Sequence, residues 1–506
     1  MINRLFRPVD ISSLAALRIM FGALMVAAMA RYFLYGWIDA MYVAPRFFFT
    51  YDGFDWVRPW PGAGMYAHYA ALVGLALCIS TGFAYRASIL LFFVGFTYAH
   101  LIDKTNYLNH YYLLSLVAFL LIFMPLGRAW SLNAYRRPAE RIDVVPQWMV
   151  WILRFQLAVV YVFAGLAKLD ADWLLHAQPL RLWLAAQGEV PILGPLLISD
   201  WAPYLFSWAG AAFDLTIVPF LLWRRTRMAA YLCVVAFHVV TALLFPIGLF
   251  PWIMMGLTTV FFEPDWPRRV IGWIRRARCV RGLSAATRNA PPQRRTHPLS
   301  PSLGKRGGTR MLNDLLPAPF SFQEKGVWGM SSALRRGRPW LQRYAVVAFL
   351  GFYAAIQLAV PLRFLGQPGA VNWTEDGFRF AWRVMLIEKY GRAVFEVRDL
   401  ATDERERIDP SLYLSPLQVR MMSTQPDMVL QFAHWLHAHA EQRGRDVEVR
   451  GRIEVSLNGR PHEPLVDPDL NLAAIPSGTP AGRWILPLQD TNARDILSVA
   501  ATRSLR

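Results

Sequence analysis

Long apolar segments separated by short polar ones fill the first 260 residues of the chain and recur once near residue 350. A helix that spans a bilayer needs about 20 predominantly apolar residues. The third segment is short, and only "FPIGLFP" (Phe245 to Pro251) separates the seventh from the eighth. The pattern therefore predicts a polytopic α-helical membrane protein with eight to nine spans, drawn from residues 12–35, 66–84, 87–102, 109–127, 147–167, 201–223, 228–246, 248–263 and 344–361.

The pattern changes after Pro361. Apolar and polar residues alternate in "AVFEVRD" (393–399) and in "DVEVRGRIEVSLNGRP" (446–461), as in half-buried strands, and the second run contains an "NG" turn. Residues 425–442 have the spacing of an amphipathic helix, with Asp427 near its start. We therefore expect residues 362–506 to form a strand-rich α+β domain.

Basic residues gather in particular loops and predict the orientation in the membrane. The loop 264–343 holds 17 Lys or Arg against three acidic residues, a local charge of +14 within the chain's +18. Cytoplasmic loops of membrane proteins carry such an excess, and this explains the charge better than nucleic-acid binding does. The Pro, Ser, Gly and Arg content of the loop 264–343, as in "PPQRRTHPLSPSLGKRGGTR", predicts that this segment is largely disordered.

Four regions follow from these patterns. They are a helical transmembrane domain at 1–263 with a cytoplasmic N-terminus, the basic cytoplasmic loop at 264–343, a last transmembrane helix at 344–361, and an extracytoplasmic domain at 362–506. Composition agrees with a lipid bilayer as the surroundings, because 55% of the residues are hydrophobic and 17% are charged, against about a quarter in soluble domains. No metal site is predicted, since His434, His437 and His439 lie on the surface of the expected helix without an acidic or Cys ligand.

The stretch "YVFAGLAKLDADW" (161–173) ends an apolar span with charged residues. On a continuous helix, Tyr161, Gly165, Lys168 and Asp172 would share one face, and Lys168 and Asp172 could form an i,i+4 ion pair. Gly165 would leave room for a flat ligand, and a desolvated lysine can act as a base. The alternative is a lysine that anchors the helix at the membrane interface together with Trp173.

Other ionisable residues are predicted at the same outer membrane edge. The loop "HLIDKTNYLNHYY" (100–112) would place Asp103, Asn106 and His110 on one face if it were helical. His238 lies within the seventh span. Ionisable groups inside spans are costly and tend to mark functional sites. We expect Lys168 and His110 to face one cavity.

Four motifs in this order resemble the vitamin K-dependent γ-glutamyl carboxylase family, including its bacterial members. They are "DKTNYLNHYYL" (103–113), "AGLAKLDADW" (164–173), "FHVVTALLFPIGLFPWIMM" (237–255) and "VNWTEDGFRFAWRVML" (371–386). The resemblance implies an enzyme that oxygenates vitamin K hydroquinone with O2 and uses the resulting base to add CO2 to a peptide glutamate. It implies no metal, and a place in the bacterial inner membrane.

The resemblance also assigns roles to individual residues. The family's membrane-edge base corresponds to Lys168, and the histidine of its "NH" pair corresponds to His110, which follows Asn109. His238 corresponds to a histidine near the quinone site, and we group Tyr161, Gly165 and Asn109 with it as cofactor-binding residues. The residues with supporting roles are Asp103, Lys104, Asp170, Asp172 and Trp173.

The chain departs from the family pattern at two aromatic residues. Family members often have a histidine at the position of Phe364 and another at Phe378. The three cysteines offer no counterpart to the disulfide of the animal enzymes. Two alternatives therefore stay open: a quinol-oxygenating enzyme with another or no carboxylation substrate, and a non-catalytic membrane module that binds a partner through its outer domain.

Overall fold

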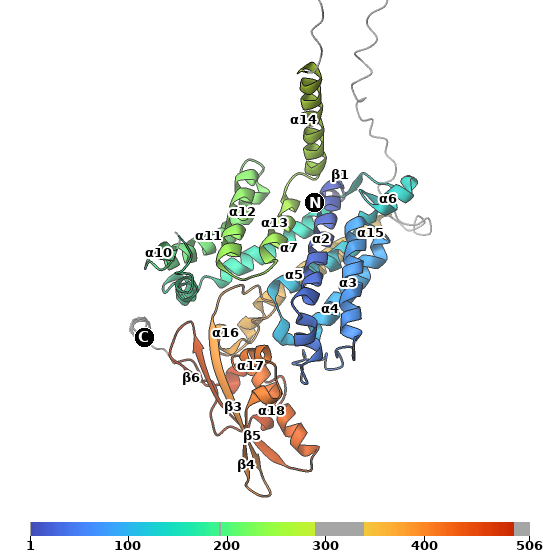
Figure 1. The fold of residues 1–506 in the computed structure, drawn as a ribbon. Helices are drawn as coiled ribbons and strands as arrows, with labels where there is room; N and C mark the ends of the chain where they lie inside the picture. Colours follow the sequence, from blue (N-terminus) through green and yellow to red (C-terminus); the bar gives the residue numbers. More distant parts are fainter. Residues whose placement is uncertain (1, 192–193, 289–338, 490–506) are drawn as a thin grey trace, which may run out of the picture.

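The protein consists of a bundle of helices and a smaller sheet domain attached to one end of that bundle (Figure 1). A computed structural model describes residues 2–191, 194–288 and 339–489. The N-terminal strand β1 (Pro8–Asp10) pairs antiparallel with β2 (Val144–Pro146) and closes the bundle at the other end, near the start of α14 (Trp266–Arg288) (Figure 1).

Each predicted apolar segment contains a helix. The bounds are α2 (Ser12–Leu34), α3 (Gly64–Thr81), α4 (Tyr85–Leu101), α5 (Asn109–Ile122), α7 (Trp148–Ala167), α11 (Ala202–Leu222), α12 (Arg227–Leu244), α13 (Phe250–Thr258) and α15 (Pro339–Leu362). In the described part of the chain, six helices are long and apolar enough to span a bilayer, namely α2, α3, α7, α11, α12 and the segment Trp340–Gly366. The prediction of a helical membrane protein is confirmed at this level, while α4, α5 and α13 are shorter.

Small residues let the helices of the bundle approach closely. A Cβ atom at Gly22 of α2 would lie 2.4 Å from the backbone nitrogen of Ser80 in α3, so only glycine fits this crossing. Such close approach is typical of helix pairs in membranes, where small residues increase van der Waals contact. Arg18 lies buried beside this crossing, and its guanidinium donates to the carbonyl oxygens of Leu126 and Trp130 at 3.3 and 2.6 Å.

The sheet domain is built on four antiparallel strands in the order β4-β3-β5-β6. Their bounds are β3 (Lys389–Asp399), β4 (Arg405–Ile408), β5 (Val447–Leu457) and β6 (Glu463–Pro464). Asn458 and Gly459 follow β5 with φ values of 52° and 81°, the left-handed backbone that an "NG" turn needs. Helices α17 (Pro416–Met422) and α18 (Pro426–Glu441) pack against the sheet, so the predicted strands and helix are confirmed.

The basic loop differs from its prediction at its start. Residues 266–288 form helix α14, which extends from the end of the bundle opposite the sheet domain (Figure 1). The prediction of disorder is wrong for this part, because Arg and Ala are good helix formers and Arg268 ties the first turn to Asp10 and Asp143 at 3.1 and 2.6 Å. The remainder of the predicted disorder, at 289–338, lies outside the described residues.

Candidate active site

Lys168 lies at the end of α7, where the helix stops at Ala167. Its side chain is 8% exposed, and Nζ donates to the carbonyl oxygen of Ala164 at 3.3 Å and to Asp214 Oδ2 at 2.8 Å. The ring of Trp173 lies 5.3 Å from Nζ, within the range of a cation–π contact. A membrane-interface anchor keeps its ammonium in water, so this buried geometry argues against the anchor interpretation.

Asp214 is the partner that sequence reasoning missed. It lies in the middle of α11, 46 positions along the chain from Lys168, and its side chain is 9% exposed. The expected i,i+4 pair between Lys168 and Asp172 does not form, because α7 ends before Lys168. An acidic residue inside "AAFDLT", an otherwise apolar span, was the signal that could have found it.

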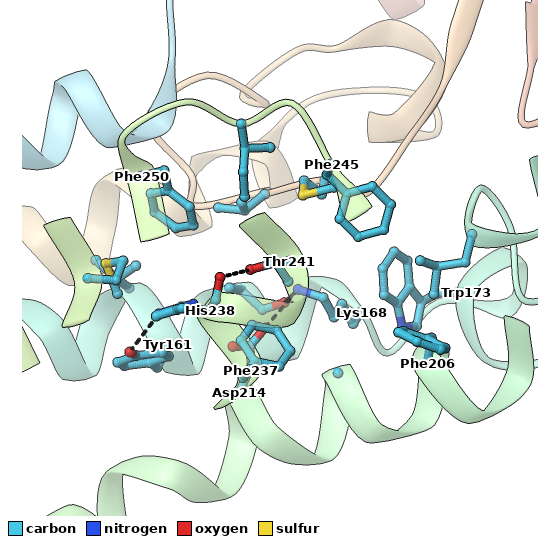
Figure 2. A pocket seen from close by; sticks show the side chains of 18 of the residues that line it. Tyr161, Lys168, Trp173, Phe206, Asp214, Phe237, His238, Thr241, Phe245 and Phe250 are labelled. Carbon is cyan, nitrogen blue, oxygen red and sulfur yellow. Dashed lines mark hydrogen bonds and ion pairs between the residues drawn. The ribbon is translucent and has the colours of Figure 1, made fainter. Parts of the chain in front are cut away.

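A small apolar cavity surrounds this ion pair (Figure 2). It has a volume of about 90 Å³ and is lined by side chains from α7, α11, α12, α13, the segment between α7 and α11, and the segment before β3. Val384 and Met385 of that segment place the cavity at the end of the bundle that faces the sheet domain. The side chains with polar atoms in its wall are those of Tyr161, Lys168, Trp173, Trp183, Asp214, His238 and Thr241.

Tyr161 and His238, both predicted as cofactor-binding residues, line this cavity together (Figure 2). The Tyr161 hydroxyl lies 3.4 Å from His238 Nε2 and 3.3 Å from Thr258 Oγ1. His238 is 2% exposed, and its Nδ1 atom has no hydrogen-bond partner among the described residues. Buried polar atoms are usually paired, so the free Nδ1 is a position where a ligand oxygen or hydroxyl could bind.

Asp170 and Asp172 hold the segment that follows Lys168. Asp170 Oδ1 accepts the backbone N–H of Asp172 at 2.9 Å and starts the short helix α8 (Ala171–Leu174). Asp172 receives two hydrogen bonds from Arg460 of the sheet domain, at 2.6 and 2.7 Å, and one from Asn458 at 2.8 Å. Burial alone would raise the pKa of Asp172, but Arg460 and Asn458 outweigh it and hold that pKa below its ordinary value. These aspartates therefore position the segment and dock the sheet domain.

His110 and Asn109 lie one residue layer away from the cavity. His110 is not among the residues lining it, and its ring lies 5.8 Å from the ring of Phe250, which does line it and lies 5.9 Å from His238. The expectation that Lys168 and His110 face one cavity is thus not met, because His110 lies behind Phe250, which separates it from His238 and the cavity. Asn109 Nδ2 donates to the carbonyl oxygen of Arg383 at 3.2 Å, so it holds the segment before β3.

Asp103 and Lys104 connect the bundle to the sheet domain and lie away from the cavity. The loop is not one helix: a single 3₁₀ turn covers Lys104–Asn106 and extended backbone follows, so the predicted common face of Asp103, Asn106 and His110 is wrong. The cause is local, since Asp103 accepts the Thr105 N–H and breaks the helix before Asn109. Lys104 Nζ forms an ion pair with Asp427 of α18 at 2.7 Å, and Gln418 donates to Asp103 at 2.8 Å.

Gly165 serves helix packing rather than ligand binding. A Cβ atom there would lie 2.8 Å from Cγ and 3.0 Å from the backbone nitrogen of Leu215 in α11. The expected room for a flat ligand is therefore filled by α11, and Gly165 does not line the cavity. The close approach that it permits is what brings Asp214, the neighbour of Leu215, within reach of Lys168.

The site offers a lysine amine, a carboxylate and a free imidazole nitrogen inside an apolar wall. Water exclusion strengthens electrostatic interactions between such groups. The proton between Nζ and Oδ2, which are 2.8 Å apart, could move to the carboxylate, and the neutral amine could then take a proton from a hydroxyl that enters the cavity. In residues 2–191, 194–288 and 339–489, no group of three His, Cys, Asp or Glu side chains is arranged to hold a metal ion.

Two family models match the chain. A model described as the HTTM domain matches residues 6–266, which contain Lys168, Asp214 and His238. A model described as the lumenal domain of vitamin K-dependent gamma-carboxylase matches residues 342–491, which contain the sheet domain and the segment that lines the cavity. No solved structure matches the chain.

Proposed function

We propose that this chain, which belongs to the vitamin K-dependent γ-carboxylase family, oxygenates vitamin K hydroquinone and uses that reaction to carboxylate glutamate in a peptide. The reactants are the quinol, O2, CO2 and a glutamate side chain, and the products are the quinone epoxide, γ-carboxyglutamate and water. The observation that carries the proposal is the Lys168–Asp214 pair, buried with Nζ and Oδ2 2.8 Å apart in an apolar cavity at the end of the bundle that faces the sheet domain.

The residues of the cavity fit a flat, lipid-soluble quinol. The rings of Phe237, Phe250 and Trp173 offer apolar surface, and the unpaired Nδ1 of His238 offers one hydrogen bond. A cavity of about 150 Å³ holds a single benzene ring, so the present volume of about 90 Å³ must grow when a quinol enters. Met254 and Met385 line the wall, and methionine side chains adapt readily to new shapes.

In this proposal the side chains bind, orient and move protons. A proton first passes from Lys168 Nζ to Asp214 Oδ2, 2.8 Å away, which leaves Nζ as the neutral amine. Nζ then accepts a proton from a quinol hydroxyl and becomes an ammonium again. The bound quinol and O2 supply a base strong enough to take the γ-proton of glutamate, which no side-chain base can remove. His238 orients the quinol through Nδ1, while Tyr161 holds the opposite ring nitrogen of that histidine. The apolar wall keeps water from the reactive groups.

The sheet domain delivers the peptide from the outer side of the membrane. Two features support this orientation: α14 with its arginines extends from the end of the bundle opposite the sheet domain (Figure 1), and basic segments favour the cytoplasmic side. We propose that the protein lies in a bacterial inner membrane with its N-terminus in the cytoplasm. His110 and Asn109 support the cavity wall through Phe250 and the carbonyl oxygen of Arg383.

Labelled carbon dioxide tests the proposal. The purified chain in detergent, supplied with reduced vitamin K, O2, a glutamate peptide and ¹⁴CO2, is expected to place the label in γ-carboxyglutamate and to form the epoxide. The matched control is the same peptide with glutamine in place of glutamate. Formation of the epoxide without labelled peptide would overturn the carboxylase proposal and favour a quinol oxygenase. Absence of both products would overturn the proposed function altogether.

A further inference from the structure

The segment between α15 and β3 has an unusual backbone. Gly377, Phe380, Trp382 and Met385 have φ values of 78°, 62°, 58° and 49°, so three non-glycine residues within six positions adopt the left-handed conformation. Such residues are uncommon and each costs free energy, and they cluster at functional sites. The segment ends with Val384 and Met385 in the wall of the cavity.

Arg383 lies in this segment, directly before the two cavity-lining residues. It is 8% exposed, and its guanidinium lies 4.5 Å from the ring of Phe364 and 5.9 Å from the ring of Phe378. Nη1 donates to Asn372 Oδ1 at 3.1 Å. Among the described residues, this neutral amide is the hydrogen-bond partner of the Arg383 side chain. Its carbonyl oxygen accepts from Asn109, which fixes the backbone at this point.

Two other arginines near the sheet domain, both mostly buried, pair with carboxylates. Arg379, four positions earlier, contacts both carboxylate oxygens of Asp427 at 2.8 and 3.2 Å. Arg460 contacts both carboxylate oxygens of Asp172. Arg383 forms none of the ion pairs of the described residues; the carboxylate of Asp170 attracts its guanidinium only at longer range, and burial outweighs this attraction and lowers the pKa of Arg383. Buried charges are normally paired, and an arginine fork matches a carboxylate with two parallel hydrogen bonds.

The two residues that depart from the family pattern both contact the guanidinium of Arg383. Phe364 and Phe378 stand where family members often have histidines, and in this chain their rings flank Arg383. Aromatic rings hold the guanidinium by cation–π contact without using its N–H donors. The donors therefore stay available to an incoming ligand, and exchange of the Asn372 amide would free another.

We propose that Arg383 binds the side-chain carboxylate of glutamate in an acidic peptide and so holds the reacting residue beside the cavity that Val384 and Met385 line. This inference rests on the proposed function for the reason to expect a glutamate substrate. The guanidinium and the carboxylate form a bidentate ion pair, and the two phenylalanines exclude water around it. Arg383 is thus a substrate-binding residue, separate from the quinol site of Lys168 and His238.

Peptide binding tests the inference independently of turnover. The full chain in detergent, without quinol, is titrated with a fluorescently labelled peptide that carries one glutamate, and with the matched glutamine peptide. For the wild type we expect tighter binding of the glutamate peptide. Arg383→Gln should weaken that binding by roughly 10- to 100-fold and leave the glutamine peptide unchanged. Arg383→Lys should recover part of the difference, because it keeps the charge without the fork.

Control variants separate binding from folding. Arg392→Gln removes an exposed arginine of β3, nine positions after Arg383, and should bind both peptides as the wild type does. Melting of each variant in detergent shows whether it is folded. Equal binding of both peptides by the wild type, or unchanged glutamate binding in both folded Arg383 variants, would overturn the inference. Absence of labelled γ-carboxyglutamate in the wild type would instead count against the proposed function alone.

Discussion

The Lys168–Asp214 pair makes a prediction that the structure lets us quantify. The pair couples α7 to α11 through two side chains that are 8% and 9% exposed. We consider three variants: Lys168→Met, Asp214→Leu, and the double variant that carries both changes. Each single change leaves one charge buried without its partner, whereas the double change replaces both charges by apolar side chains of similar length.

The magnitudes follow from the geometry. At a separation of 2.8 Å, an effective dielectric constant of about 20 gives a gross attraction of about 6 kcal/mol between the two charges. Desolvation offsets most of this attraction, so the net contribution of a buried pair is small. Removal of one partner nevertheless costs about 3–5 kcal/mol, while replacement of both is often neutral or stabilising. We therefore expect the double variant to be more stable than either single variant, and all three to lose epoxidation.

Unfolding in mixed micelles measures this prediction. Increasing mole fractions of sodium dodecyl sulfate unfold the helical domain, and tryptophan fluorescence reports the transition for each of the four proteins. The free energies of unfolding then form a double-mutant cycle. If the double variant loses as much stability as the two single variants together, within about 0.5 kcal/mol, the two groups do not interact. That result would refute this description of the site.

Three further substitutions test other parts of the structure. Gly165→Ala should cost about 1–3 kcal/mol of stability, because its Cβ would lie 3.0 Å from the backbone nitrogen of Leu215; an unchanged melting temperature in detergent would contradict the packing role. Because Arg460 lowers the pKa of Asp172, the stability that this carboxylate contributes is present above about pH 3.9 and is lost as the pH falls through the lowered pKa. The stability gap between wild type and Asp172→Asn should therefore shrink below about pH 4, and a gap independent of pH would argue against it. His238→Ala should raise the KM for the quinol about five- to tenfold with the peptide KM unchanged, and an equal rise in both would assign His238 a structural role.

Much of the fold could be predicted because it depends on local pattern. The helices follow from hydropathy, and the turn at Asn458 and Gly459 follows from two residues that tolerate positive φ. Helix α14 was missed because the composition of the whole loop hid a short stretch with good helix formers and an anchoring arginine, Arg268.

The candidate site was predicted only in part, because its decisive contacts are distant in sequence. Lys168, Tyr161 and His238 were predicted as site residues, and the structure places them around one cavity. Nothing in the spacing of "KLDADW" showed that α7 ends before Lys168 and that Asp172 binds the sheet domain. The partner comes from α11, and its position depends on how closely the two helices pack at Gly165. The separation of His110 from the cavity likewise depends on Phe250, which belongs to another helix.

Quinol epoxidation by Lys168→Ala tests the central claim most directly. The reference is Leu169→Ala, which changes the adjacent residue, whose side chain is 55% exposed. With both variants folded in detergent and supplied with reduced vitamin K and O2, we expect Leu169→Ala to retain wild-type turnover and Lys168→Ala to lose about 10²- to 10⁴-fold, the usual contribution of a general base. Wild-type epoxidation by folded Lys168→Ala would contradict the account.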